Sequence, residues 1–153
     1  MPNAADKGNA ILAFLYFLAS TVITWWFVAA NEDLYKGDYR VMFLSCGIAG
    51  AKWGVQIVAA LLFLGRQRWA FLHRIGFTCL IGSIILVPAF LPLIQMRGET
   101  LFLYLLIASV LTMMVMYYYS VRRSGISIRW FFGWLLCLAI AITLQLTVVF
   151  HVV

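Results

Sequence analysis

The chain has 153 residues, of which 65% are hydrophobic and 10% are charged. A soluble domain averages about 45–50% apolar and about 25% charged residues. This composition excludes an ordinary water-covered surface and indicates a chain that lipid solvates. We expect one integral membrane domain over residues 1–153 and no second, soluble domain. The predicted fold class is all-α, a polytopic transmembrane helix bundle.

Five apolar segments are long enough to cross a membrane as helices, since about 20 apolar residues span a hydrocarbon core of about 30 Å. In chain order they cover residues 11–30, 41–64, 75–95, 101–120 and 130–153. A helix satisfies its own backbone in lipid, whereas membrane strands alternate in polarity and are about 10 residues long. The first segment has no small-residue cleavage site, so we expect a retained helix and not a signal peptide.

The polar segments between the spans predict an orientation. Residues 65–74 and 121–129 each carry three arginines and no carboxylate, whereas residues 31–40 are acidic on balance. The two arginine-rich segments are the second and fourth loops, so they share one side, which the positive-inside rule makes cytoplasmic. The N-terminus is then cytoplasmic and the C-terminus outside. We expect a multi-pass protein of the bacterial inner (plasma) membrane.

The net charge of +6 does not indicate a nucleic-acid partner. The arginines are spread over two short loops, so no folded basic surface is available. They can instead touch anionic lipid headgroups. Aromatic residues near the same boundary are typical of rings held at headgroup depth, and a ligand platform is the weaker interpretation of the three tyrosines. These residues include Trp69, Tyr117, Tyr118, Tyr119 and Trp130.

Lys52 is the most unusual residue of the spans. It lies at the middle of the second span, near the bilayer midplane, where inserting a lysine costs about 2.5–3.5 kcal/mol. No Asp or Glu lies inside any span. Four solutions stay open: an uncharged lysine, hydrogen bonds to oxygens such as that of Gln145, a wet cavity that holds an anion, or a carboxylate on another subunit. Two interpretations of Lys52 carry equal weight: a buried lysine with a structural role only, and a functional residue.

Helical geometry gives the second span two faces, and a helix that uses both is expected to be central in the bundle. A Gly-x-x-x-Gly step on one face allows another helix to approach closely. Polar residues within about 40° of Lys52 share the opposite face. The expected packing residues are Cys46, Gly50 and Gly54. The candidate functional polar residues are Ser45, Lys52 and Gln56, with Gln145 of the fifth span.

Motifs for catalysis or metal binding are missing from the sequence. Cys46, Cys79 and Cys137 fall in different spans without C-x-x-C spacing, as expected of small apolar residues. His73 and His151 lie on opposite sides in the expected topology, so they cannot form a haem-ligating pair at one depth. We predict no catalytic residue, no metal and no cofactor.

Three functions stay open. The leading one is a non-catalytic subunit or accessory protein of a membrane complex, whose partner is another membrane helix or subunit in a homo- or hetero-oligomer. The alternative is a small transporter or channel for an anion or acidic solute, with Lys52 in the pathway and Ser45 and Gln56 beside it. A lipid- or quinone-handling enzyme is the least supported, since acid–base groups are missing from the spans.

Overall fold

The protein is described by a computed structural model, which covers residues 4–30, 39–96 and 99–152. These residues form five α-helices, one 3-10 turn and no strand, which confirms the all-α class for the described part of the chain. The elements are α1 (Ala4–Ala30), α2 (Tyr39–Phe63), η2 (Gly65–Gln67), α3 (Arg68–Met96), α4 (Glu99–Arg123) and α5 (Arg129–Val152).

Two helical stretches among the described residues are long and apolar enough to cross a membrane. They are Ala4–Trp26 and Cys46–Phe63, and a third apolar stretch, Arg129–Gln145, is shorter. Large apolar side chains stay exposed on the helices, for example Leu62 and Leu136. Exposed apolar surface of this kind is unusual for a soluble monomer, so both observations support a membrane location.

The connection between α2 and α3 is shorter than the sequence predicts. α3 begins at Arg68 and not at residue 75. Most of the expected loop over 65–74 is therefore helical, and the turn η2 connects α2 to α3. Phe71 and Leu72 are buried in the core, and their burial makes helix formation favourable from Arg68 onward. The helix therefore begins before the predicted span, and the span bounds 75–95 stay a prediction.

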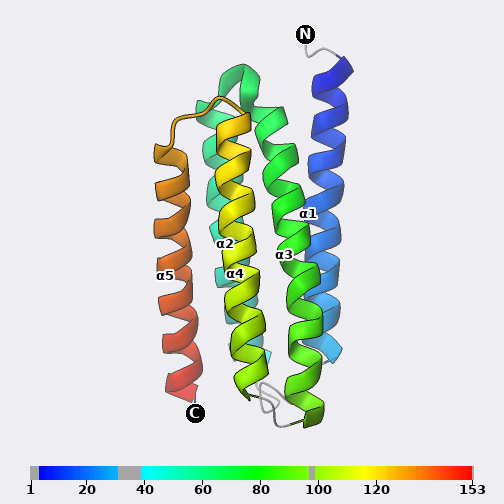
Figure 1. The fold of residues 1–153 in the computed structure, drawn as a ribbon, viewed down its shortest axis with the longest axis vertical. Helices are drawn as coiled ribbons and strands as arrows, with labels where there is room; N and C mark the ends of the chain where they lie inside the picture. The colour runs from blue at the N-terminus through cyan, green and yellow to red at the C-terminus, as the bar shows by residue number, and fades with distance from the viewer. Residues whose placement is uncertain (1–3, 31–38, 97–98, 153) are drawn as a thin grey trace.

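The five helices run up and down and lie side by side (Figure 1). The beginning of α1, the turn η2 and the connection between α4 and α5 lie at one end, and α5 finishes at the other. α3 lies between α1 and α4 in Figure 1 and packs against both, whereas α2 packs mainly against α5. The central helix is therefore α3, not α2 as the two-faced pattern predicts.

The contact between α1 and α3 is close at Gly76. A Cβ atom added there would lie 3.3 Å from Cβ of Tyr16 and 3.4 Å from the carbonyl oxygen of Ala13. Farther along the two helices, Oγ of Ser20 lies 2.6 Å from Oγ of Ser83. A small residue and a hydroxyl pair thus join these helices, as is common between membrane helices.

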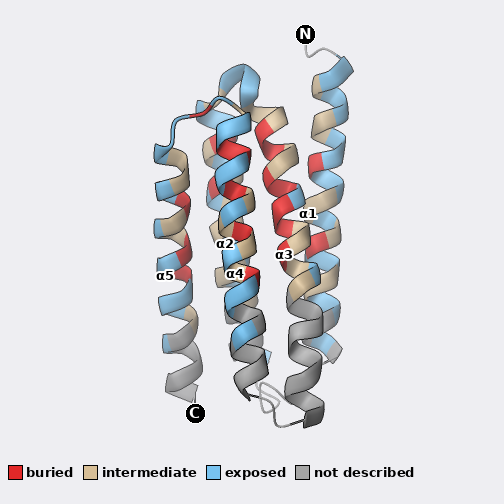
Figure 2. Ribbon diagram, in the orientation of Figure 1, coloured by how far each residue is buried: buried red, intermediate tan, exposed pale blue. Residues whose placement is uncertain are grey.

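Buried residues gather on the inner faces of the helices, and many lie nearer the end with η2 (Figure 2). Tyr117 of α4 and Trp134 of α5 are fully buried and stack with ring centroids 4.5 Å apart. Phe71 meets Tyr117 edge-on at 5.9 Å. Tyr117 is therefore a core residue and not part of a headgroup belt, whereas Tyr118 and Tyr119 are exposed.

Candidate functional site

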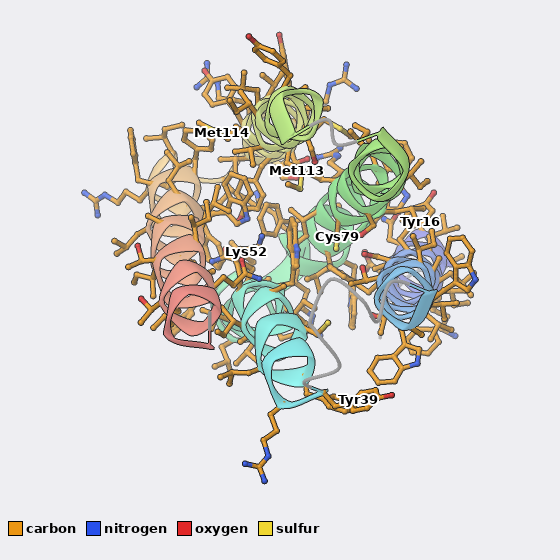
Figure 3. All side chains as sticks on the ribbon, turned by 90° about the horizontal axis from the view of Figure 1, so that it is seen from below. Tyr16, Tyr39, Lys52, Cys79, Met113 and Met114 are labelled. Carbon is orange, nitrogen blue, oxygen red and sulfur yellow. The ribbon has the colours of Figure 1, made fainter. Side chains whose placement is uncertain are left out.

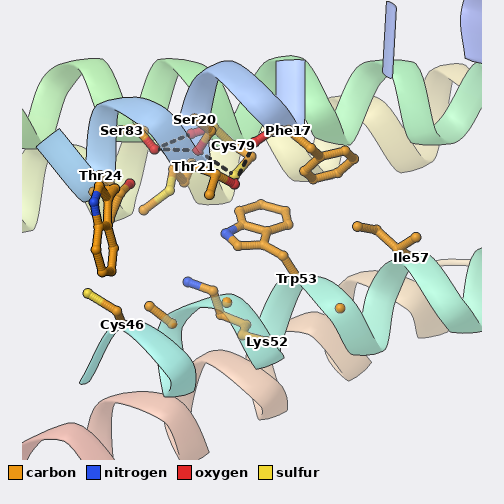
Figure 4. Close-up of a pocket in the computed structure, with 16 residues that line it drawn as sticks. Phe17, Ser20, Thr21, Thr24, Cys46, Lys52, Trp53, Ile57, Cys79 and Ser83 are labelled. Atoms are coloured by element: carbon orange, nitrogen blue, oxygen red, sulfur yellow. Dashed lines mark hydrogen bonds between the residues drawn. The ribbon is translucent and has the colours of Figure 1, made fainter. Parts of the chain in front are cut away.

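Lys52 lines a cavity of about 370 Å³ among α1, α2 and α3, to which α4 contributes one methionine (Figure 4). This cavity is called the Lys52 cavity below. Its volume lies in the range of small-molecule sites. Figure 3 views the bundle from below and places Lys52 and Cys79 in its interior. The residues that α2 contributes are Cys46, Ala49, Gly50, Lys52, Trp53, Gly54 and Ile57.

Hydroxyl groups form the polar part of the opposite wall. Ser20, Thr21 and Thr24 come from α1, and Ser83 comes from α3. Oγ of Ser20 lies 3.1 Å from Sγ of Cys79, and Ser83 donates to the carbonyl oxygen of Cys79 at 3.1 Å. These bonds orient the hydroxyls of Ser20 and Ser83, whose oxygens keep further acceptor capacity.

The Lys52 side chain is half-buried, and its Nζ lies 5.3 Å from the centroid of the Trp53 ring. An ammonium group over an aromatic face gains a cation–π attraction. The residues that line the cavity include no carboxylate. Within the part of the chain that the structure describes, the lysine thus faces an aromatic ring and a hydroxyl-bearing wall and has no anion beside it.

The predicted helix-packing residues line the same cavity. Cβ atoms added at Gly50 or Gly54 would meet nothing within 4 Å, so no described helix uses these glycines for close approach. Cys46, a half-buried free thiol, continues their row. Close packing at Cys46, Gly50 and Gly54 stays a prediction, which now concerns a helix of another chain.

The predicted polar face separates into different environments. Gln56 is buried away from the cavity, where its Oε1 accepts a hydrogen bond from Tyr117 at 2.7 Å and its Nε2 donates to Sγ of Cys137 at 3.7 Å. Gln145 is half-buried on α5 and is not among the cavity-lining residues. The Ser45 side chain lies outside the described residues. Of the three members of this set whose side chains the structure describes, Lys52 alone lines the cavity.

The sequence pattern did not lead to a prediction of the hydroxyl wall, which consists of Ser20, Thr21, Thr24 and Ser83. Ser20, Thr21 and Thr24 follow one another at spacings that bring hydroxyls to adjoining turns of one helix. That pattern was available as a signal, but serine and threonine inside membrane helices commonly bond to their own backbone. Their position opposite Lys52 depends on the packing of α1 against α3, which no local pattern shows.

A second cavity, of about 710 Å³, lies among α1, α3 and α4, and is called the arginine cavity below. It uses another face of α3 and contains His73, Arg74 and Arg123. The described residues include no group of three or more His, Cys, Asp or Glu side chains that could hold a metal ion.

Comparisons with protein families, with curated proteins and with solved structures gave no match for this chain. The candidate functional surfaces are the two cavities and the open face of α2, which is the face that carries Gly50 and Gly54. The chemistry of these surfaces comes from a lysine, several hydroxyls and a pair of arginines.

Proposed function

We propose that this chain is a five-span integral membrane protein that serves as a non-catalytic subunit or accessory protein of a membrane complex. The supporting observation is the open face of α2, where Gly50 and Gly54 border unfilled space beside Lys52. Small residues allow a second helix to approach closely. A lysine at membrane depth is stabilised by a polar or anionic partner. A partner helix that carries a carboxylate provides both contacts.

The five-span arrangement is part of this proposal. α3, α4 and α5 have 29, 25 and 24 residues, and about 20 are needed to cross the hydrocarbon core. Arg66 of η2 and Arg123 of α4 belong to the end of the bundle that also holds the start of α1. The positive-inside rule makes that end cytoplasmic, in the inner membrane of a bacterial cell.

Site-specific photo-crosslinking in intact membranes tests the partner. A photoreactive residue at Gly50 is expected to give a crosslinked protein product, and the same residue at Ile140, an exposed position on α5, is the matched control. Lys52→Met is expected to weaken the Gly50 product, because it removes the charge that the partner recognises. Crosslinks from Gly50 to lipid alone, with a strictly monomeric protein in mild detergent, would contradict the proposal.

A second candidate function is a transporter or channel for an anion or acidic solute. It is favoured by the Lys52 cavity, in which one ammonium group faces the hydroxyls of Ser20, Thr24 and Ser83. Acetate and chloride flux into proteoliposomes separates the two candidates. If transport is the function, Lys52→Met abolishes flux and Lys7→Met, at an exposed position near the start of α1, does not. Unchanged flux in Lys52→Met would exclude this role.

A further inference from the structure

The arginine cavity has a cationic end. Arg74 of α3 and Arg123, the last residue of α4, both line it, together with His73. Its polar lining adds the hydroxyls of Thr78 and Ser120, and no carboxylate is among the described residues that line it. Two guanidinium groups that line one cavity form a site for an anion, and the planar donor fork of arginine suits a phosphate group.

One arginine of this cavity is held in place by the bundle. Nη1 of Arg74 on α3 donates a hydrogen bond at 2.6 Å to Oγ of Ser124, the residue that follows the end of α4. A guanidinium has five N–H donors, so this bond leaves donors for a ligand. The ring of His73 stacks on Tyr16 of α1 with centroids 5.5 Å apart.

The same cavity has an apolar wall. Phe77 and Met116 line it, and the ring of Tyr16 meets Phe77 at a centroid distance of 5.6 Å. Phe77 lies about one helical turn beyond Arg74, farther from the end of the bundle where α3 begins. The lining thus changes from cationic to apolar along the direction in which a lipid changes from headgroup to acyl chain.

We propose that the arginine cavity binds one anionic phospholipid. Its phosphate lies between Arg74 and Arg123, and the first part of an acyl chain lies against Phe77 and Met116. A free phosphate would use only the arginines and would leave the apolar wall without a ligand. Basic pockets between membrane helices on the cytoplasmic side are suited to anionic headgroups. The inference rests on the membrane location in the proposed function and is independent of the partner and transport roles.

Native mass spectrometry of the detergent-solubilised full chain tests this site. Wild-type protein is expected to retain one phosphatidylglycerol in preference to phosphatidylcholine. Each arginine contributes about fivefold to that preference, which corresponds to about 1 kcal/mol per basic residue. The double variant R74Q/R123Q is therefore expected to lose about 25-fold. R66Q/R129Q is the matched control, since it removes the same charge at exposed positions outside the cavity.

Four results would overturn the proposal. Equal losses in the two double variants would mean diffuse attraction to the basic end of the bundle. Displacement of phosphatidylglycerol by millimolar inorganic phosphate would identify free phosphate as the ligand. If R74Q/R123Q does not fold, R123Q alone gives the answer, because Arg123 is exposed at the end of α4, and an unchanged lipid preference would exclude the site. A protein that sediments with membranes but retains phosphatidylglycerol and phosphatidylcholine equally would refute the lipid site and leave the proposed membrane location intact.

Discussion

At the residue scale, Gln56 shows how a polar side chain inside a span can belong to the core. Its Oε1 accepts a hydrogen bond from Tyr117 at 2.7 Å, and both residues are buried. Tyr117→Phe removes the donor and leaves the amide oxygen without it, which costs about 1–3 kcal/mol for a buried polar group. We expect a lower free energy of unfolding for this variant, measured by thermal unfolding in detergent.

Tyr118→Phe is the control for that measurement, because Tyr118 is the adjacent tyrosine and its side chain is exposed. A shift of the same size in both variants would mean that the Gln56 hydrogen bond contributes nothing specific.

The different environments of Lys52 and Gln56 show how much residue spacing alone can predict. Their four-residue separation places them about 40° apart on one helix, and the sequence identifies both as unusual. Gln56 is bound by Tyr117 of α4 and Cys137 of α5, whereas Lys52 reaches the cavity next to α1 and α3. These neighbours are distant in sequence, so helical periodicity alone cannot assign the two side chains to different environments.

At the scale of elements, the contact of α1 with α3 depends on Gly76. Its Cβ position lies 3.3 Å from Cβ of Tyr16, so a larger side chain crowds the contact between the two helices. Overpacking of this kind costs about 1–3 kcal/mol. Gly76→Val is expected to lower the unfolding temperature in detergent, whereas Gly47→Val, where a Cβ would meet nothing within 4 Å, is expected to be tolerated. Equal unfolding temperatures of the two variants would show that a side chain at residue 76 does not crowd the contact between α1 and α3.

The location of this contact explains why helix packing was harder to predict than helix formation. A Gly-x-x-x-Gly step is recognisable in sequence, and it predicts close packing at Gly50 and Gly54. Gly76 has no glycine four residues away, yet it makes the close approach. Small residues permit close packing, but whether a helix approaches them depends on the order of the helices in space. α1 packs along α3 although α2 follows it in the chain.

At the scale of the whole molecule, hydrophobicity predicts the helical fold and leaves the arrangement open. Apolar length alone indicates helices, because lipid offers the backbone no other partners. Arrangement follows from contacts such as Tyr117 on Trp134, which join distant segments. The exact ends of the helices also depend on burial, as the early start of α3 at Arg68 shows.

The topology of the whole chain can be tested with reporters fused at the two ends of the bundle. The turn η2 and the connection between α4 and α5 lie at one end, with Arg66 and Arg123. Because basic segments are retained in the cytoplasm, green fluorescent protein fused after Arg66 or Ser124 is expected to fluoresce. Alkaline phosphatase fused after Gly98, between α3 and α4, is expected to be active, since it folds only outside the cytoplasm. A fluorescent fusion after Gly98 would contradict five spans, because α3 would then begin and end on the same side.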